Sequence, residues 1–171
     1  MDRPYAVLFI SRRNSARGLM AEAVVNRYGK GRFCAYSAAV DPAGKVDPLA
    51  LQVLQQGGYS TQELQSKHWR RFAGPDAPLL DFVFTLGNTA SHDAFPAWPG
   101  KPVSSHWRYP DPTKVAGDER QRRLECARTL SALERQMRVF MNLSSASLDR
   151  IALKRRLDEL DTEQDAPEAA Q

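Results

Sequence analysis

Two adjoining stretches, Tyr5-Ala-Val-Leu-Phe-Ile10 and Ser11-Arg-Arg-Asn-Ser-Ala-Arg-Gly18, decide how this chain folds. The first is a short apolar run of the kind that forms a buried strand. The second is polar and opens a helical pattern that begins near Arg17. In a tight loop at a helix N-terminus, backbone N–H groups converge on one point and the helix dipole adds positive potential there. The sequence therefore predicts an anion site in residues 11–18.

Three arginines strengthen this prediction, because the planar guanidinium group makes bidentate contacts with phosphate-like oxyanions. They are Arg12, Arg13 and Arg17, all in or beside the loop. We expect the anion to be bound by Arg12, Arg13, Asn14, Ser15, Ala16, Arg17 and Gly18. The loop lacks a strong nucleophile, since its first residue is Ser11.

The composition is that of an ordinary globular protein. The 171 residues are 42% hydrophobic and 26% charged, which argues against a mostly disordered chain. A net charge of +4, spread along the chain, favours anionic ligands and gives no reason to expect nucleic acid as a partner. No apolar run suggests a membrane span or a signal peptide, so we expect a cytoplasmic protein. Two cysteines, Cys34 and Cys126, are too few for a disulfide framework or a zinc site, and no metal or cofactor is expected.

Strand and helix patterns alternate along the chain. Strands are predicted over residues 5–10, 33–40, 82–86 and 101–106. Helices are predicted from Arg17 to Tyr28, after the Asp47-Pro48 cap as far as Gly57, over 66–72, over 118–143, and over 148–160 with Ser147 as the cap. The 118–143 helix carries one apolar stripe, made of Leu124, Ala127, Leu130, Met137 and Met141.

This alternation predicts an α/β fold with three layers, in which a four-stranded parallel sheet has helices on both faces. We expect the main domain to cover residues 1–143, and residues 144–171 to form a C-terminal helical extension and a frayed tail. In such folds ligands bind beyond the C-terminal ends of the strands. The 11–18 loop lies at that end of the first strand, so position and chemistry agree.

A series of short motifs resembles the low-molecular-weight protein tyrosine phosphatases and, more closely, the thioredoxin-coupled arsenate reductases that share their fold. The motifs are Val7-Leu-Phe-Ile10, Asn14-Ser15-x-Arg17 with Met20-Ala21-Glu22, Tyr36-Ser37-Ala38, Asp47-Pro48-Leu49, Asp81-Phe-Val-Phe-Thr-Leu86, and His106-Trp107 ahead of Asp111-Pro112. The resemblance covers roughly residues 5–142 and implies the same four-stranded fold.

The resemblance also implies catalytic positions and shows where this chain departs from them. In that family a cysteine thiolate at the start of the loop attacks the oxyanion, an arginine holds it, and an aspartate of an Asp-Pro pair protonates the leaving group. Those positions correspond here to Ser11, Arg17 and Asp111. The further cysteines of the arsenate reductases are also missing, since residues 85–96 contain none. This joint loss argues for natural divergence away from thiol chemistry.

The sequence therefore predicts a phosphatase-like protein without catalysis that binds phosphate, arsenate or a phosphorylated group in the 11–18 loop. One alternative is a working tyrosine phosphatase or arsenate reductase with a non-standard nucleophile. Another is a protein-interaction module that uses its amphipathic helices, including self-association into a homo-oligomer. His68, His92 and His106 are the only histidines, and none stands where it would serve Ser11 as a general base.

Overall fold

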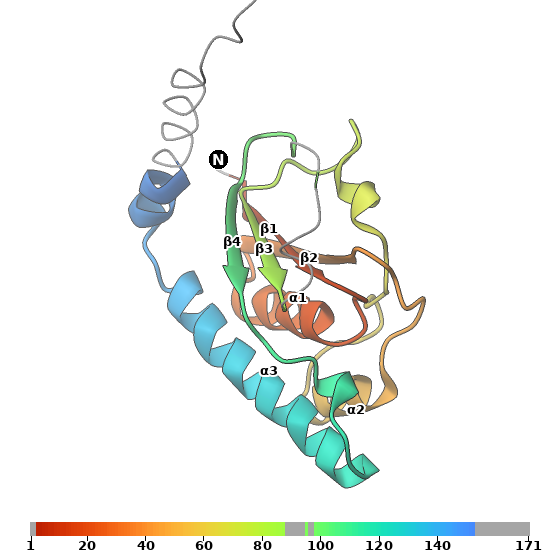
Figure 1. Ribbon diagram of the computed structural model, residues 1–171. Coiled ribbons are helices and arrows are strands. Elements are labelled where there is room, and N and C mark those ends of the chain that lie inside the picture. Colours follow the sequence, from red (N-terminus) through yellow and green to blue (C-terminus); the bar gives the residue numbers. More distant parts are fainter. Residues whose placement is uncertain (1–2, 88–94, 96–97, 153–171) are drawn as a thin grey trace, which may run out of the picture.

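A computed structural model describes residues 3–87, 95 and 98–152 of the chain. Four strands form one sheet, namely β1 (Tyr5–Ser11), β2 (Phe33–Ala39), β3 (Phe82–Leu86) and β4 (Val103–Trp107). Their spatial order is β2-β1-β3-β4 and every pair is parallel. Figure 1 shows β1 inside the sheet, with its C-terminal end leading into helix α1. The expected four-stranded parallel sheet is confirmed.

Three α-helices cover one face of this sheet: α1 (Arg17–Tyr28), α2 (Pro48–Gln56) and α3 (Glu119–Met141). The Asp47 carboxylate caps α2 by accepting from the N–H groups of Leu49 and Ala50, and Pro48 takes the first turn. Asp118 and Gln121 form a capping box at the start of α3. The helix boundaries therefore follow from local sequence signals.

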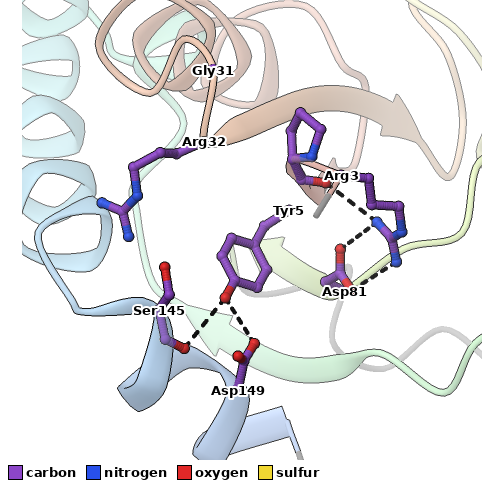
Figure 2. A pocket seen from close by; sticks show the side chains of 8 residues that line it. Arg3, Tyr5, Gly31, Arg32, Asp81, Ser145 and Asp149 are labelled. Atoms are coloured by element: carbon purple, nitrogen blue, oxygen red, sulfur yellow. Dashed lines mark hydrogen bonds and ion pairs between the residues drawn. The ribbon is translucent and has the colours of Figure 1, made fainter. Parts of the chain in front are cut away.

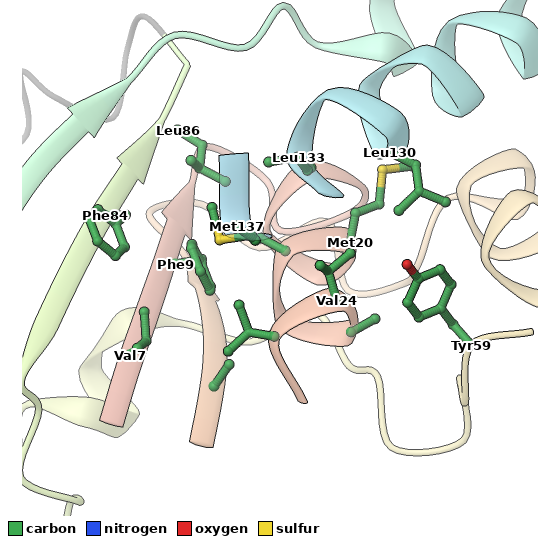
Figure 3. Packing of buried hydrophobic residues seen from close by; sticks show 14 of the residues in the cluster. Val7, Phe9, Met20, Val24, Tyr59, Phe84, Leu86, Leu130, Leu133 and Met137 are labelled. Atoms are coloured by element: carbon green, nitrogen blue, oxygen red, sulfur yellow. The ribbon is translucent and has the colours of Figure 1, made fainter. Parts of the chain in front are cut away.

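The larger hydrophobic core lies between these helices and the sheet. Alternate residues of β1, such as Val7 and Phe9, point to this face. The buried side chains of α1 and α3 pack with them in one cluster. Figure 3 shows this cluster with Val7, Phe9, Met20, Val24, Phe84, Leu86, Leu130, Leu133 and Met137. The apolar side of α3 is thus occupied within the chain.

The opposite face of the sheet has a second, smaller core. Ala6, Leu8 and Ile10 of β1 point to it, and the 3₁₀-helix η1 (Trp69–Phe72) contributes Phe72. Trp69, Phe95 and Trp98 pack around its edge, with ring centroids 5.7–5.9 Å apart. Helical elements on both faces make the predicted three layers.

A short helix over 145–152 follows α3 and lies at the N-terminal end of the sheet (Figure 1). The Tyr5 hydroxyl lies between Asp149 and Ser145 (Figure 2): it donates to Asp149 Oδ1 at 2.7 Å, and the Ser145 carbonyl oxygen is 3.3 Å away. Arg32 donates to the carbonyls of Met141 and Leu143, which holds the turn between the two helices. The helix over 145–152 is therefore held against β1 through Tyr5. Residues 153–171, including the predicted tail, lie outside the described range.

Several sequence predictions need correction. Ser144 rather than Ser147 caps the last helix, because Ser144 Oγ accepts from the Ser147 N–H at 3.1 Å. Leu124 is 50% exposed, and Leu133, which the predicted stripe did not include, is fully buried in the core. The short helix after Ser66 begins only at Trp69, and the fourth strand extends to Trp107. Most of the expected loop over 87–99 lies outside the described residues.

Candidate functional site

The 11–18 segment connects the end of β1 to the start of α1, at the C-terminal edge of the sheet. Asn14 turns the chain there with φ +48°, a left-handed conformation that asparagine tolerates. Its N–H donates to Ser11 Oγ at 3.2 Å, and its Nδ2 donates to the Gln65 carbonyl at 3.3 Å. Asn14 therefore closes the loop from both its backbone and its side chain.

The carbonyl groups of the loop point outward, to the segment that follows β2. Arg12 O accepts from the Asp41 N–H, Arg13 O from the Ala43 N–H and Ser66 Oγ, and Ser15 O from the Asp47 N–H, all at 2.9–3.0 Å. In a trans peptide the C=O and the next N–H point in opposite directions. The N–H groups of Arg13, Asn14 and Ala16 therefore point inward.

Two of these inward donors, the N–H groups of Arg13 and Ala16, have no acceptor within residues 3–87, 95 and 98–152. The N–H group of Ser15, between them, also has none within these residues. The buried Oδ1 of Asn14 also has no partner there. Backbone N–H groups without an acceptor at a helix N-terminus can bind an anion.

Close packing at the start of α1 depends on Gly18. A Cβ at this position would lie 3.1 Å from Asn14 Oδ1, 3.2 Å from Ser11 Oγ and 3.4 Å from Ser37 Cβ. A glycine therefore lets the helix approach the back of the loop. Ser11 itself is 2% exposed, so its hydroxyl faces the loop and not open solvent.

Arg17 is the first residue of α1, and only 7% of it is exposed. Its Nη1 donates to the Tyr109 carbonyl at 2.8 Å, and its Nη2 lies 3.5 Å from Asp111 Oδ2. Burial lowers the pKa of Arg17 and the Asp111 carboxylate opposes that effect. A guanidinium remains charged in proteins, so the site holds a fixed cation.

Asp111 is positioned by the 3₁₀-helix η3 (Pro112–Lys114), for which it is the N-cap. Its Oδ1 accepts from the Thr113 N–H at 2.9 Å and from Thr113 Oγ1 at 2.6 Å. This leaves Oδ2 facing Arg17. The structure therefore brings together two residues that lie 94 positions apart in the sequence.

A buried polar cluster supports the loop from below. Glu22 of α1 accepts from Ser37 Oγ at 3.1 Å and lies 3.9 Å from Lys67 Nζ, which also donates to the Gln65 carbonyl at 3.0 Å. Burial raises the pKa of Glu22, and the charge of Lys67 opposes that shift. The carbonyl that holds Asn14 is therefore also held by Lys67.

Together these groups line a small pocket. Its lining is Ser11, Arg13, Asn14, Ser15, Ala16, Arg17 and Asp111. All but two of the predicted site residues are among them. Gly18 acts behind the loop, and Arg12 contributes its carbonyl to the outer wall.

The sequence-based prediction missed the residues that hold this loop from other segments. They are Asp41, Gln65, Ser66, Lys67, Gly87 and Tyr109. Most act through backbone atoms or lie in irregular segments, so side-chain chemistry alone gave no signal for them.

The other chemically active side chains lie elsewhere. His106 Nδ1 is 2.7 Å from Thr85 Oγ1 on the neighbouring strand, a structural pairing. Among the residues that the structure describes, no group of three or more His, Cys, Asp or Glu side chains could hold a metal ion. No helix in that part of the chain is long and apolar enough to cross a membrane.

The fold and the site define a parallel α/β protein with a basic strand–loop–helix pocket beside an Asp-Pro turn. Residues 6–154 match the low molecular weight phosphotyrosine protein phosphatase family, and the chain belongs to that family. An arsenate reductase from Halalkalibacterium halodurans is 28% identical over 137 residues, which are 78% of this chain and 93% of that protein.

Solved structures give the same result. The crystal structure of an arsenate reductase from Archaeoglobus fulgidus has 25% identity and a TM-score of 0.59, covering 76% of this chain and 97% of the other. A structure described as an arsenate reductase in the phosphate binding state has 20% identity and a TM-score of 0.63, covering 80% and 96%. These similarities confirm the predicted family and its nearness to the arsenate reductases.

Proposed function

We propose that this chain is a non-catalytic member of its family that binds an oxyanion, such as phosphate, arsenate or a phosphorylated group, in the 11–18 loop. The observation that carries the proposal is that the N–H groups of Arg13, Ser15 and Ala16 have no acceptor in the described part of the chain and lie next to the buried guanidinium of Arg17. Donors and charge of this kind bind an anion without any further chemistry. A phosphate-bound relative of the same fold is consistent with the proposal.

The absence of catalysis follows from Ser11. A hydroxyl is a weak nucleophile unless an adjacent general base takes its proton. The carboxylate in the pocket, Asp111, accepts from Thr113 and faces Arg17, and among the described residues no hydrogen bond joins it to the Ser11 hydroxyl. Ser11 can therefore line the site but has no group to activate it among the residues that line the pocket.

A reductase with a relocated thiol is disfavoured by the position of both cysteines. Cys126 is 1% exposed, and burial raises its pKa to about 11, which keeps it protonated. Cys34 lies five residues before the C-terminal end of β2, about 17 Å from the loop edge at 3.3 Å per residue. The interaction alternative is also weakened, because Leu130, Met137 and Met141 of the α3 stripe are buried in the core.

Isothermal titration calorimetry with phosphate and with arsenate tests the proposal. We expect the wild-type protein to bind, and Arg17→Ala to weaken binding at least tenfold, since charge-assisted hydrogen bonds are lost. Arg128→Ala is the matched control, because Arg128 is exposed on α3 and pairs only with Glu125 among the described residues. Absent binding, or equal binding by wild type and Arg17→Ala, would overturn oxyanion binding. Turnover of p-nitrophenyl phosphate that Ser11→Ala abolishes would overturn the absence of catalysis.

A further inference from the structure

Arg13 is the residue of the loop that the single-anion function leaves unexplained. Its carbonyl is fixed by the Ala43 N–H at 2.9 Å and by Ser66 Oγ at 3.0 Å, so its backbone does not move with the side chain. The side chain lines the pocket and is still 43% exposed. The Arg13 side chain therefore extends from a fixed backbone position at the edge of the pocket.

The partner of Arg13 in the structure is a carboxylate that a ligand can replace. Arg13 Nη1 lies 2.7 Å from Asp41 Oδ2, and the Asp41 side chain is 59% exposed. Ion pairs between two such solvent-exposed groups contribute little to stability. The Arg13 guanidinium can thus bind an anionic group of a ligand in place of Asp41 with little loss of folding stability.

The pocket contains a second cation besides Arg17. Among the described residues, two guanidinium groups line it, Arg13 and Arg17, and the carboxylate in the lining, Asp111, lies against Arg17. A first oxyanion that takes the loop N–H groups and Arg17 leaves Arg13 available for a second. Because Arg13 belongs to the same short loop, the second group must be close to the first.

We propose that the site selects ligands that carry two linked oxyanion groups, with Arg13 as the specificity-determining residue for the second group. This inference rests on the proposed oxyanion binding at the same loop. The ligand class is a diphosphate, in which one bridging atom separates the two groups. The planar guanidinium of Arg13 suits bidentate contact with such a group.

The test compares inorganic phosphate with methylenediphosphonate, a diphosphate analogue that resists hydrolysis, by calorimetry at constant ionic strength. The quantity measured is the ratio of their dissociation constants. We expect wild type to bind the diphosphonate more tightly, and Arg13→Gln to lower that preference about fivefold to tenfold, because charge-assisted contacts are lost. Asp41→Asn frees Arg13, so it raises the preference about twofold to threefold.

Arg12→Gln is the matched control. It removes the same charge from the neighbouring residue, whose side chain does not line the pocket. It lowers both affinities by a similar factor and so keeps the ratio. The inference alone is overturned if wild type binds phosphate but shows no preference, or if Arg12→Gln and Arg13→Gln change the ratio equally. Failure of wild type to bind either probe overturns the proposed function and this inference together.

Discussion

The guanidinium of Arg17 lies 3.5 Å from Asp111 Oδ2, with only 8% and 14% of the two side chains exposed. A carboxylate therefore stands beside the cation that the proposed site offers to an anion. Opposite charges attract more strongly where solvent is largely excluded. Asp111 consequently lowers the net positive potential of the pocket.

Replacing Asp111 by Asn is expected to tighten phosphate binding about threefold to tenfold, because a nearby negative charge is removed. The Asn side chain can still accept from the Thr113 N–H, so η3 keeps its cap. Calorimetry on both proteins measures the change. Asp149→Asn removes a carboxylate at the opposite end of the sheet and should leave phosphate affinity unchanged. Weaker binding by Asp111→Asn would contradict this electrostatic role.

Gly87 lies directly against Arg17. It has φ +91°, and a Cβ at this position would overlap Arg17 Nη1. Gly87→Ala should therefore displace the guanidinium and weaken phosphate binding at least tenfold. The substitution should also lower the free energy of unfolding by about 1 kcal/mol, because alanine is strained at this backbone conformation. Gly44→Ala is the control, since Gly44 has φ +80° with nothing within 4 Å. Both variants should lose stability in urea unfolding, and similar anion affinities in the two would contradict the prediction.

Ser11→Cys tests whether the loop N–H groups, Arg17 and Asp111 support catalysis when a thiol replaces the hydroxyl. The converging N–H groups and Arg17 should lower the thiol pKa, so a thiolate exists at neutral pH. We expect this variant to hydrolyse p-nitrophenyl phosphate where the wild type does not. Adding Asp111→Asn should slow hydrolysis about a hundredfold or more, as loss of a general acid does. An inert but folded Ser11→Cys protein would show that the loop no longer holds phosphate in a reactive geometry.

The fold was predictable because its signals are local. Apolar runs marked β1 and β3, and Asp47-Pro48 marked the start of α2 within one residue. The predictions that needed correction concern positions where the local sequence allows more than one structure. Ser144 and Ser147 are both good caps, and only the packing of Leu148, which is 0% exposed, decides between them. Leu124 fits the helical period, but the buried face of α3 is the one that carries Cys126, Leu130 and Leu133, and Leu124 is half exposed.

The site was predictable only in part. Residues 11–18 form a contiguous motif, so their role could be inferred from chemistry and spacing. Tyr109 and Gln65 support the site through backbone carbonyl groups, which any residue type supplies. Gly87 supports it by having no side chain, and the sequence does not show that this glycine lies against Arg17. Such contacts follow from the tertiary fold alone.

Glu22 makes stability depend on pH in a direction that can be measured. Burial raises the pKa of Glu22 above its ordinary value of 4.5, so the folded protein binds more protons than the unfolded chain just above pH 4.5. The free energy of unfolding therefore falls as pH rises through that window. Glu22→Gln removes this dependence, and its stability relative to wild type should increase from pH 4.5 towards neutrality.

Urea unfolding at several pH values measures this difference. Glu119→Gln serves as the control, because the Glu119 side chain is 63% exposed and its removal should not change the slope. Parallel pH profiles for wild type and Glu22→Gln would show that Glu22 titrates alike in the folded and unfolded chains.

Tyr5 connects the first strand to the helix over 145–152, and its hydroxyl is the group that does so (Figure 2). Tyr5→Phe keeps the ring, which packs on Phe33 and Phe82, but removes the hydrogen bonds to Asp149 and Ser145. We expect a loss of about 1 kcal/mol.

The effect should be local, because Leu148 still buries its side chain in the core. Hydrogen exchange at the Leu148 N–H, which donates to the Ser144 carbonyl, should become faster while exchange in β1 stays unchanged. Tyr36→Phe is the control, since the Tyr36 hydroxyl contacts Cys34 on β2 and not the extension. Equal exchange at Leu148 in all three proteins would show that the helix is held by Leu148 and Arg32 without help from Tyr5.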